Sequence, residues 1–320
     1  MRFNILVSSL AAALALPAIS FGAVMFSENF DVDPTANWTL NGGPSDEAAN
    51  FFFDYSTVGI PSAPGSVGGT TRGMKLQANQ ANGIFSGASA SPNGQSFQGD
   101  YIVQFDWWGN FNGPFPVGGS GSTQMSTFGV GTSGTVVQWP GGTQDSIWFG
   151  GTVDGNSASD WRAYSPTAPT RYVDTAPGIY AAGAVAGSTN GSNAYYAGFG
   201  SNAAPAAQLL LFPQQTGTTG VGSAGMEWHQ VEIAKMGGSV TWRVGGVLIA
   251  TVPVADDTAA GGTNIFFGHS DTNLTSSTDP NDGALLFTLI DNIRVVPEPG
   301  ALVVWLLIGV CGLFGTLRSR

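Results

Sequence analysis

YIVQFDWWG, residues 101–109, decides the fold class, because its apolar side chains recur at every second position. Counting from Tyr101, the odd-numbered positions carry Tyr, Val, Phe and Trp, and the even-numbered positions carry Ile, Gln, Asp and Trp. A period of two is typical of a strand with one buried face, whereas a helix repeats about every 3.6 residues. The stretch therefore predicts a strand whose odd-numbered residues face the core.

The same period continues along the chain. In EWHQVEIAK (227–235) His229 falls with Val231 and Ile233 on the predicted core face, and Gly245-Gly246 marks a hairpin turn between 239–244 and 247–252. Further strands are expected at 24–30, 50–55, 74–78, 124–130, 136–139, 146–149, 193–198, 208–212, 263–268 and 285–295. About a dozen strands predict an all-β, two-sheet antiparallel sandwich of jelly-roll type, with helix signals only at the two ends of the chain.

The composition agrees with one packed domain over residues 24–294. Glycine is abundant, at 47 of 320 residues, and only 10% of residues are charged, but nine Trp and 20 Phe are too much apolar surface for a disordered chain. The single cysteine, Cys311, lies near the C-terminus, so no disulfide is expected. The domain must be stabilised by its core alone.

The first 23 residues read as a secretory signal peptide that forms an N-terminal signal helix. Arg2 supplies a positive start, residues 5–16 are mostly apolar, and small residues surround 18–23. Cleavage is expected after Ser20 or at Gly22 or Ala23. Export across the inner membrane follows from this assignment.

The last residues carry a second membrane signal. From Pro299 to Leu317 there are 19 residues without a charge, and Arg318 and Arg320 follow at once. A helix over 300–317 is close to the length that crosses a bilayer, and basic residues beside a span stay in the cytoplasm. The sequence predicts a C-terminal transmembrane helix with the rest of the chain outside. An uncleaved membrane anchor is the plain alternative.

The tail resembles the PEP-CTERM sorting domain of Gram-negative bacteria. The motif is Pro297-Glu298-Pro299, then the apolar span, then Arg318 and Arg320. The resemblance covers residues 295–320 and implies processing by an exosortase, a membrane-embedded transpeptidase that cuts near Pro-Glu-Pro. It implies delivery to the cell surface or the extracellular matrix, with the tail as a transient anchor.

A second resemblance concerns the domain itself. GMEWHQVEIAKMGGSVTWRVGGVLIATV (225–252) is similar to the strand pair of concanavalin A-like and laminin-G-like domains. The opening SENFDVDPTANWTLNG (27–42) and the closing FTLIDNIRVV (287–296) resemble those of exported jelly-roll modules with this tail. The family's usual Asp-Gly turn is replaced here by Gly245-Gly246. The resemblance implies the sandwich fold and is weak for function.

The charge and motifs favour a non-enzymatic role. The whole chain has a net charge of −11, and the segment between the leader and the tail is more acidic still, near −13, so nucleic acid is excluded as a partner. A glycoside hydrolase needs two facing carboxylates, but no Glu-x-Asp-x-x-Glu run exists, and the two histidines lack metal-ligand spacing. We expect a structural or adhesive surface protein, with a carbohydrate-active enzyme as the alternative.

Weak binding of extracellular polysaccharide is the specific expectation. Glycans are held by aromatic rings and by amide or carboxylate groups. Two predicted strand faces combine these groups, and if they meet they form a groove. The candidate residues are Gln104, Asp106, Trp108, Trp228, Gln230 and Glu232. The alternative is that loops cover the tryptophans and make a second small core.

Calcium is the only cofactor that the sequence suggests. The loop DTNLTSSTDPNDG crowds oxygen-bearing side chains that calcium favours. They are Asp271, Asn273, Asp279, Asn281 and Asp282. The alternative is that these residues bond their own backbone in turns.

Overall fold

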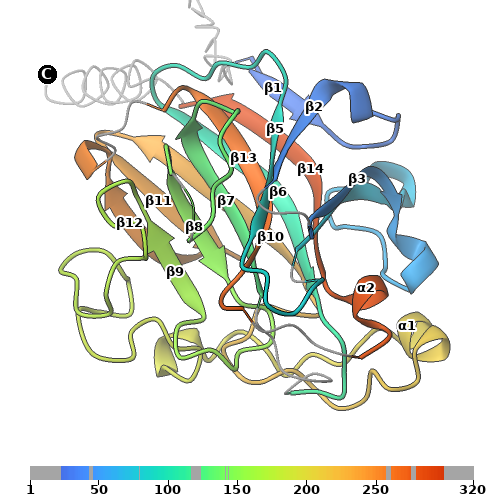
Figure 1. Ribbon diagram of the computed structural model, residues 1–320. Helices are drawn as coiled ribbons and strands as arrows, with labels where there is room; N and C mark the ends of the chain where they lie inside the picture. Colours follow the sequence, from blue (N-terminus) through green and yellow to red (C-terminus); the bar gives the residue numbers. More distant parts are fainter. Residues whose placement is uncertain are drawn as a thin grey trace, which may run out of the picture. The chain divides into compact units, whose positions relative to one another are not determined.

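The computed structural model describes residues 23–42, 46–78, 80–116, 124–140, 142, 144–256, 261–274 and 279–298. Within these ranges the strands form two antiparallel sheets, sheet A with eight strands and sheet B with six (Figure 1). Sheet A has the order β12-β11-β10-β6-β14-β4-β3, with β1 also paired to β14, and sheet B has the order β2-β5-β13-β7-β8-β9. The predicted all-β two-sheet sandwich is confirmed.

Neighbouring strands are mostly not consecutive in the chain, so the sheets are assembled from distant segments. Sheet A holds β1 (Phe26–Glu28), β3 (Ala48–Asp54), β4 (Arg72–Gln77), β6 (Tyr101–Asn110), β10 (Trp228–Met236), β11 (Ser239–Val244), β12 (Val247–Pro253) and β14 (Phe287–Pro297). Sheet B holds β2 (Trp38–Gly42), β5 (Gly87–Pro92), β7 (Gln124–Thr132), β8 (Ile147–Gly151), β9 (Trp161–Tyr164) and β13 (Asn264–Asp271). Two short helices, α1 (Ala206–Leu211) and α2 (Asp282–Leu285), lie in connections.

The inner faces of the two sheets meet in an aromatic core. The ring centroid of Phe105 on β6 lies 4.9 Å from that of Phe267 on β13. Trp107 lies 5.3 Å from Phe128 on β7, and both rings are at most 1% exposed. The period of two therefore places the odd-numbered residues of 101–107 in the core, as predicted, and burying such rings is the main stabilising term of the fold.

A buried chain of hydrogen bonds links the two sheets through this core. The Trp107 indole N–H donates to Ser126 Oγ at 2.9 Å, and Ser126 Oγ lies 2.6 Å from Thr288 Oγ1. His269 Nδ1 lies 2.8 Å from Thr288 Oγ1, and His269 Nε2 bonds Gln124 Oε1. Burial lowers the pKa of His269 to about 3, so the imidazole is neutral. This histidine is a structural residue of the core.

Some predicted strands are absent. Residues 208–212 fall mainly in helix α1, and residues 194–196 form a 3-10 turn capped by the Asn193 side chain, which accepts from Tyr195 N–H. Residues 136–139 belong to a connection in which Gln138 N–H donates to Ser89 Oγ on β5 at 2.8 Å. Strands β2, β5 and β9 were missed, since small residues or short length weaken their pattern.

The C-terminal boundary of the domain lies a few residues beyond its predicted end at Arg294. Residues Val24–Glu298 form one compact unit, and β14 continues to Pro297, so Val295 is a core residue although it was assigned to the tail. No helix among the described residues is long and apolar enough to cross a membrane. The predicted signal helix and the predicted span over 300–317 lie outside the described residues.

Candidate functional site

A cavity of about 510 Å³ lies on the outer face of sheet A, the face turned away from sheet B. Most of its lining is polar. Ser27 and Glu28 come from β1 and Asn29 follows it, Gln104, Asp106 and Gln230 come from β6 and β10, and Asn292 and Arg294 come from β14. Its volume is within the range of ligand sites, about 300–1,000 Å³. This cavity is called the polar groove.

A bulge in β14 shapes this groove. Asp291 pairs with Asp106 on β6, and Arg294 pairs with Gln104. Between these two pairs β14 has two residues where β6 has one, which defines the bulge. Asn292 has a φ of 53°, a left-handed conformation that asparagine tolerates better than most residues. Its amide donates to Asp106 Oδ2 at 2.9 Å and to Ser66 Oγ at 3.0 Å. The bulge thus turns both Asp291 and Arg294 to the outer face.

The connection between β3 and β4 closes one side of the groove. Gly65 N–H donates to Asp106 Oδ2 at 2.8 Å. A Cβ at Gly65 would lie only 2.7 Å from the same oxygen, so only a glycine lets the backbone come this close to Asp106. Beside it, Asp291 Oδ2 accepts from the Tyr55 and Ser66 hydroxyls at 3.0 and 2.9 Å. Burial raises the pKa of Asp291 to about 7, although these hydrogen bonds oppose the rise.

Glu28 is the second carboxylate of the groove. Its Oε1 accepts from Phe30 N–H at 2.8 Å, so it also holds the turn that follows β1. Burial raises the pKa of Glu28, and the hydrogen bonds from Phe30 and Asn29 only partly offset this effect. The two carboxylates that line the groove, Asp106 and Glu28, are therefore each held in place by a backbone N–H group, that of Gly65 and that of Phe30.

Three of the six predicted glycan residues meet in the groove, namely Gln104, Asp106 and Gln230. They meet because β10 and β6 are paired, with Gln230 opposite Asp106 and Glu232 opposite Gln104. The Gln104 amide donates to Glu232 Oε2 at 3.2 Å, which places Glu232 beside the groove but not in its lining. The sequence pattern thus located one wall of the site.

The two predicted tryptophans are not free stacking surfaces. Trp108 is 2% exposed, and its ring centroid lies 5.7 Å from that of Trp228. Trp228 is half-buried, packs edge-on against Tyr55 at 5.3 Å and donates its indole N–H to the Pro61 carbonyl at 2.8 Å. The prediction that Trp108 offers an exposed ring is wrong, because the ring is buried beside Trp228, which in turn contacts Tyr55 and Pro61. Both tryptophans are covered, but they join the main hydrophobic core, Trp108 as a member and Trp228 packed against it, and do not form a second small core.

The five predicted calcium ligands do not form one cluster. Asp271 is fully buried and its Oδ2 accepts from Ser86 N–H at 3.0 Å, while Asp282 Oδ1 accepts from the Asn112 amide at 3.1 Å. Asp279 Oδ1 accepts from the backbone and side-chain N–H of Asn281, an Asx turn. Across the described residues, no three His, Cys, Asp or Glu side chains are grouped to hold a metal ion. The calcium prediction, with Asn273 included, is not supported by this arrangement.

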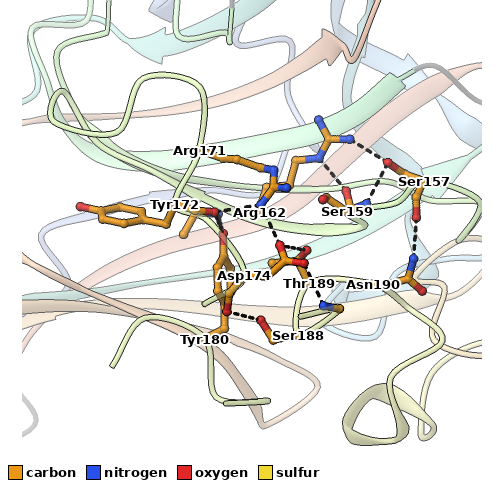
Figure 2. Close-up of polar contacts among 12 residues, drawn as sticks. Ser157, Ser159, Arg162, Arg171, Tyr172, Asp174, Tyr180, Ser188, Thr189 and Asn190 are labelled. Atoms are coloured by element: carbon orange, nitrogen blue, oxygen red, sulfur yellow. Dashed lines mark hydrogen bonds and ion pairs between the residues drawn. The ribbon is translucent and has the colours of Figure 1, made fainter. Parts of the chain in front are cut away.

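A second polar cluster, formed by β9 and the segments on either side of it within residues 157–190, is structural. Asp174 Oδ1 accepts from Thr189 and forms an ion pair with Arg171 at 2.9 Å, and Asp174 Oδ2 accepts from Gly187 N–H (Figure 2). Burial alone would raise the pKa of Asp174, but these partners outweigh it and lower the pKa. Arg162 ties the same region to Ser157 at 2.8 Å. The charges are satisfied within the chain, so this cluster holds the loop that covers β9.

The sorting-signal residues are only partly described. Pro297 ends β14 opposite Tyr101, and Glu298 follows as an exposed residue. Pro299, Arg318 and Arg320 lie outside the described residues. The first residue of the motif is therefore paired in the sheet, with no free linker between the domain and the motif.

Several groove residues were not predicted as site residues. Asn292 and Arg294 belong to the resemblance motif FTLIDNIRVV, but the bulge that turns them outward has no sequence signal of its own. Glu28 is the last residue of β1, and only the pairing of β1 with β14 brings it to the groove. The sequence signal for these residues is that polar side chains stand inside strands β1 and β14.

Comparison with known proteins gives distant likeness only. No family model and no curated protein sequence matches the chain. Among solved structures, a Bacillus subtilis protein of unknown function with a galectin-like fold matches at 10% identity and a TM-score of 0.44, covering 87% of this chain and 97% of that one. The exoplasmic/lumenal domain of VIP36, in a Ca²⁺- and mannose-bound form, matches at 7% identity and a TM-score of 0.40, covering 81% and 82%. A Bacillus licheniformis β-glucanase matches at 11% identity and a TM-score of 0.39, covering 85% and 98%.

These matches concern the sandwich fold. At such low identities and TM-scores they carry no conclusion about what this chain binds or whether it is an enzyme. The resemblance of the tail to the PEP-CTERM domain stays a prediction, since no family model matches.

Proposed function

We propose that this chain is an exported, non-enzymatic β-sandwich of the cell surface or extracellular matrix that binds polysaccharide weakly in the polar groove. The observation that carries the proposal is the groove itself, where amides and carboxylates converge from strands that are far apart in the chain. Amides both donate and accept, and carboxylates accept, which matches the hydroxyl groups of a sugar. No ring among its described lining residues is exposed, since Phe105 is 1% exposed, so the affinity is weak.

Replacing Gln230 by alanine tests the groove. Gln230 is exposed and lines the cavity, so the substitution removes hydrogen bonds to the glycan without disturbing the core. We expect about a three- to tenfold loss of affinity, as one or two hydrogen bonds each contribute about 0.5–1.5 kcal/mol. Isothermal titration against a polysaccharide selected on a glycan array measures it.

The matched control for this test is Thr241→Ala. Thr241 lies on β11, on the same outer face of sheet A but outside the cavity lining. Its variant should bind like the wild type. Equal losses in both variants, or no loss in Gln230→Ala, would remove the groove from the proposal.

A glycoside hydrolase is the second candidate, and one observation favours it: Glu28 and Asp106 line the same cavity, and burial raises the pKa of Glu28, as a general acid requires. Against it, both carboxylates are engaged by donors of the chain. A reducing-end assay on the bound polysaccharide decides the matter. Product formation by the wild type that is lost in both Glu28→Gln and Asp106→Asn would replace our proposal with the hydrolase.

The proposed export and sorting depend on the two chain ends. We expect an exosortase to remove the tail near Pro297-Glu298-Pro299, so the surface form should end close to Glu298. Intact-mass spectrometry of the native surface protein measures its C-terminus. A surface form that still ends at Arg320 would establish the alternative, an uncleaved membrane-anchored domain.

A further inference from the structure

Arg294 stands out among the basic side chains of the described residues. Arg72 and Arg171 form ion pairs, Lys75 and Lys235 lie over aromatic rings, and Arg162 and Arg243 donate to oxygens of the chain. Within the same described ranges, the Arg294 guanidinium has no ion pair, hydrogen bond or ring contact. It is exposed, and it is the basic residue that lines the polar groove.

The position of Arg294 is set by the sheet. It is opposite Ser27 on β1 and opposite Gln104 on β6, so its side chain lies in a row of polar residues across the outer face. The bulge at Asn292 places the Arg294 side chain on the outer face. Arg294 is three residues after Asp291, so in a regular strand the two side chains would lie on opposite faces. The strand pairing on both sides fixes the point from which the guanidinium reaches the cavity.

The acids of the groove do not neutralise this guanidinium by contact. Asp106 Oδ2 is held by Gly65 N–H and the Asn292 amide, and Glu28 Oε1 is held by Phe30 N–H. Neither carboxylate forms an ion pair with Arg294 within the described part of the chain. The net charge of −11 repels anionic polymers in general, so this unpaired cation in the polar cavity is the local group that can bind an anionic group of a ligand.

We propose that Arg294 determines the specificity of the groove and that the glycan it takes is a uronic acid polymer whose carboxylate binds this guanidinium. The inference rests on the proposed function and names its ligand class. A guanidinium offers a planar pair of N–H donors that fits a carboxylate with two parallel hydrogen bonds. The amides of Gln104 and Gln230 remain for the neutral hydroxyls of the same sugar.

The test compares polygalacturonate with its fully methyl-esterified form, which has the same backbone without the charge. We expect the wild type to bind the acid at least about tenfold more tightly than the ester, and the preference to fall with added salt. Arg294→Gln should lower the affinity for the acid about tenfold and leave the ester unchanged. Arg294→Lys should give an intermediate value, because it keeps the charge and loses the fork.

The matched control is Arg243→Gln, which removes an equal charge from the same face of sheet A outside the cavity lining and should leave both affinities unchanged. Equal binding of acid and ester by the wild type, or an unchanged Arg294→Gln, overturns the inference but leaves glycan binding in place. Dextran sulfate bound as tightly as polygalacturonate overturns the assignment to a carboxylate. A wild type that binds no polysaccharide, charged or neutral, overturns the proposed function itself.

Discussion

Replacing Trp108 by alanine is expected to destabilise the protein by about 3–5 kcal/mol, the usual cost of removing a buried tryptophan. The ring is 2% exposed, packs against Trp228 and donates its indole N–H to Asn110 Oδ1 at 3.0 Å. Its removal leaves a cavity beside the Trp228 ring. Urea denaturation followed by circular dichroism measures the free energy of unfolding.

The conservative control is Trp108→Phe, which keeps most of the ring volume and loses only the indole donor. It should cost clearly less than Trp108→Ala. Where Trp108→Ala remains folded, its glycan affinity at low temperature should be close to that of the wild type, because the ring does not line the groove. A stable Trp108→Ala variant with selectively lost binding would return this residue to the binding surface and contradict its burial.

Replacing Asp154 by asparagine is expected to stabilise the protein at pH 8. Asp154 is 1% exposed, and burial first and the charge of Asp160 second raise its pKa to about 7 from an ordinary 3.8. A carboxyl whose pKa is higher in the folded than in the unfolded protein does not lower the free energy of unfolding below about pH 4. As the pH rises toward and through 7, the buried carboxyl must ionise and the free energy of unfolding falls. The gain of Asp154→Asn should therefore be near zero at pH 4 and on the order of 4 kcal/mol at pH 8.

Asp160→Asn is the matched control, since Asp160 is equally buried and burial also raises its pKa, but its carboxylate accepts several short hydrogen bonds that oppose the rise. Its Oδ1 accepts from the Thr152 hydroxyl at 2.5 Å and Ser157 N–H at 3.1 Å, and its Oδ2 accepts from Gly191 N–H at 2.6 Å. An amide would turn a donor toward one of these donors, so Asp160→Asn should lose about 1–3 kcal/mol at pH 8. Unfolding curves between pH 4 and 8 measure both variants. A pH-independent difference for Asp154→Asn would contradict the raised pKa.

The aromatic strands were the predictable part of the fold. In 101–109 and 227–235 large apolar residues alternate with polar ones, so burial of one face dictates the strand and its orientation. Elsewhere the local pattern failed. Residues 209–211 are three successive leucines without a period, and they form the second half of helix α1, whereas β5 reads GASASP and is a strand because β2 and β13 pair with it on either side.

The candidate site divides in the same way. Gln104, Asp106 and Gln230 could be predicted, because they stand opposite the apolar face of two strong strands. Glu28, Gly65 and Arg294 could not be predicted. The pairing of β1, β14 and β6 and the contact of the β3–β4 loop with Asp106 bring them together from distant parts of the chain. Trp108 was misplaced because a strand pattern shows which side a ring faces but not which loop lies over that side.

By itself, the sequence determined that the chain is an all-β sandwich with an acidic composition and an aromatic core. Those properties depend on residue type and on a period of two, which are local. Only the tertiary structure decided that Trp108 is covered, that the calcium candidates lie apart, and that Arg294 points into a polar groove. The physical reason is that pairing order, the bulge at Asn292 and the close approach of Gly65 are contacts between residues far apart in the chain, and the local pattern does not contain them.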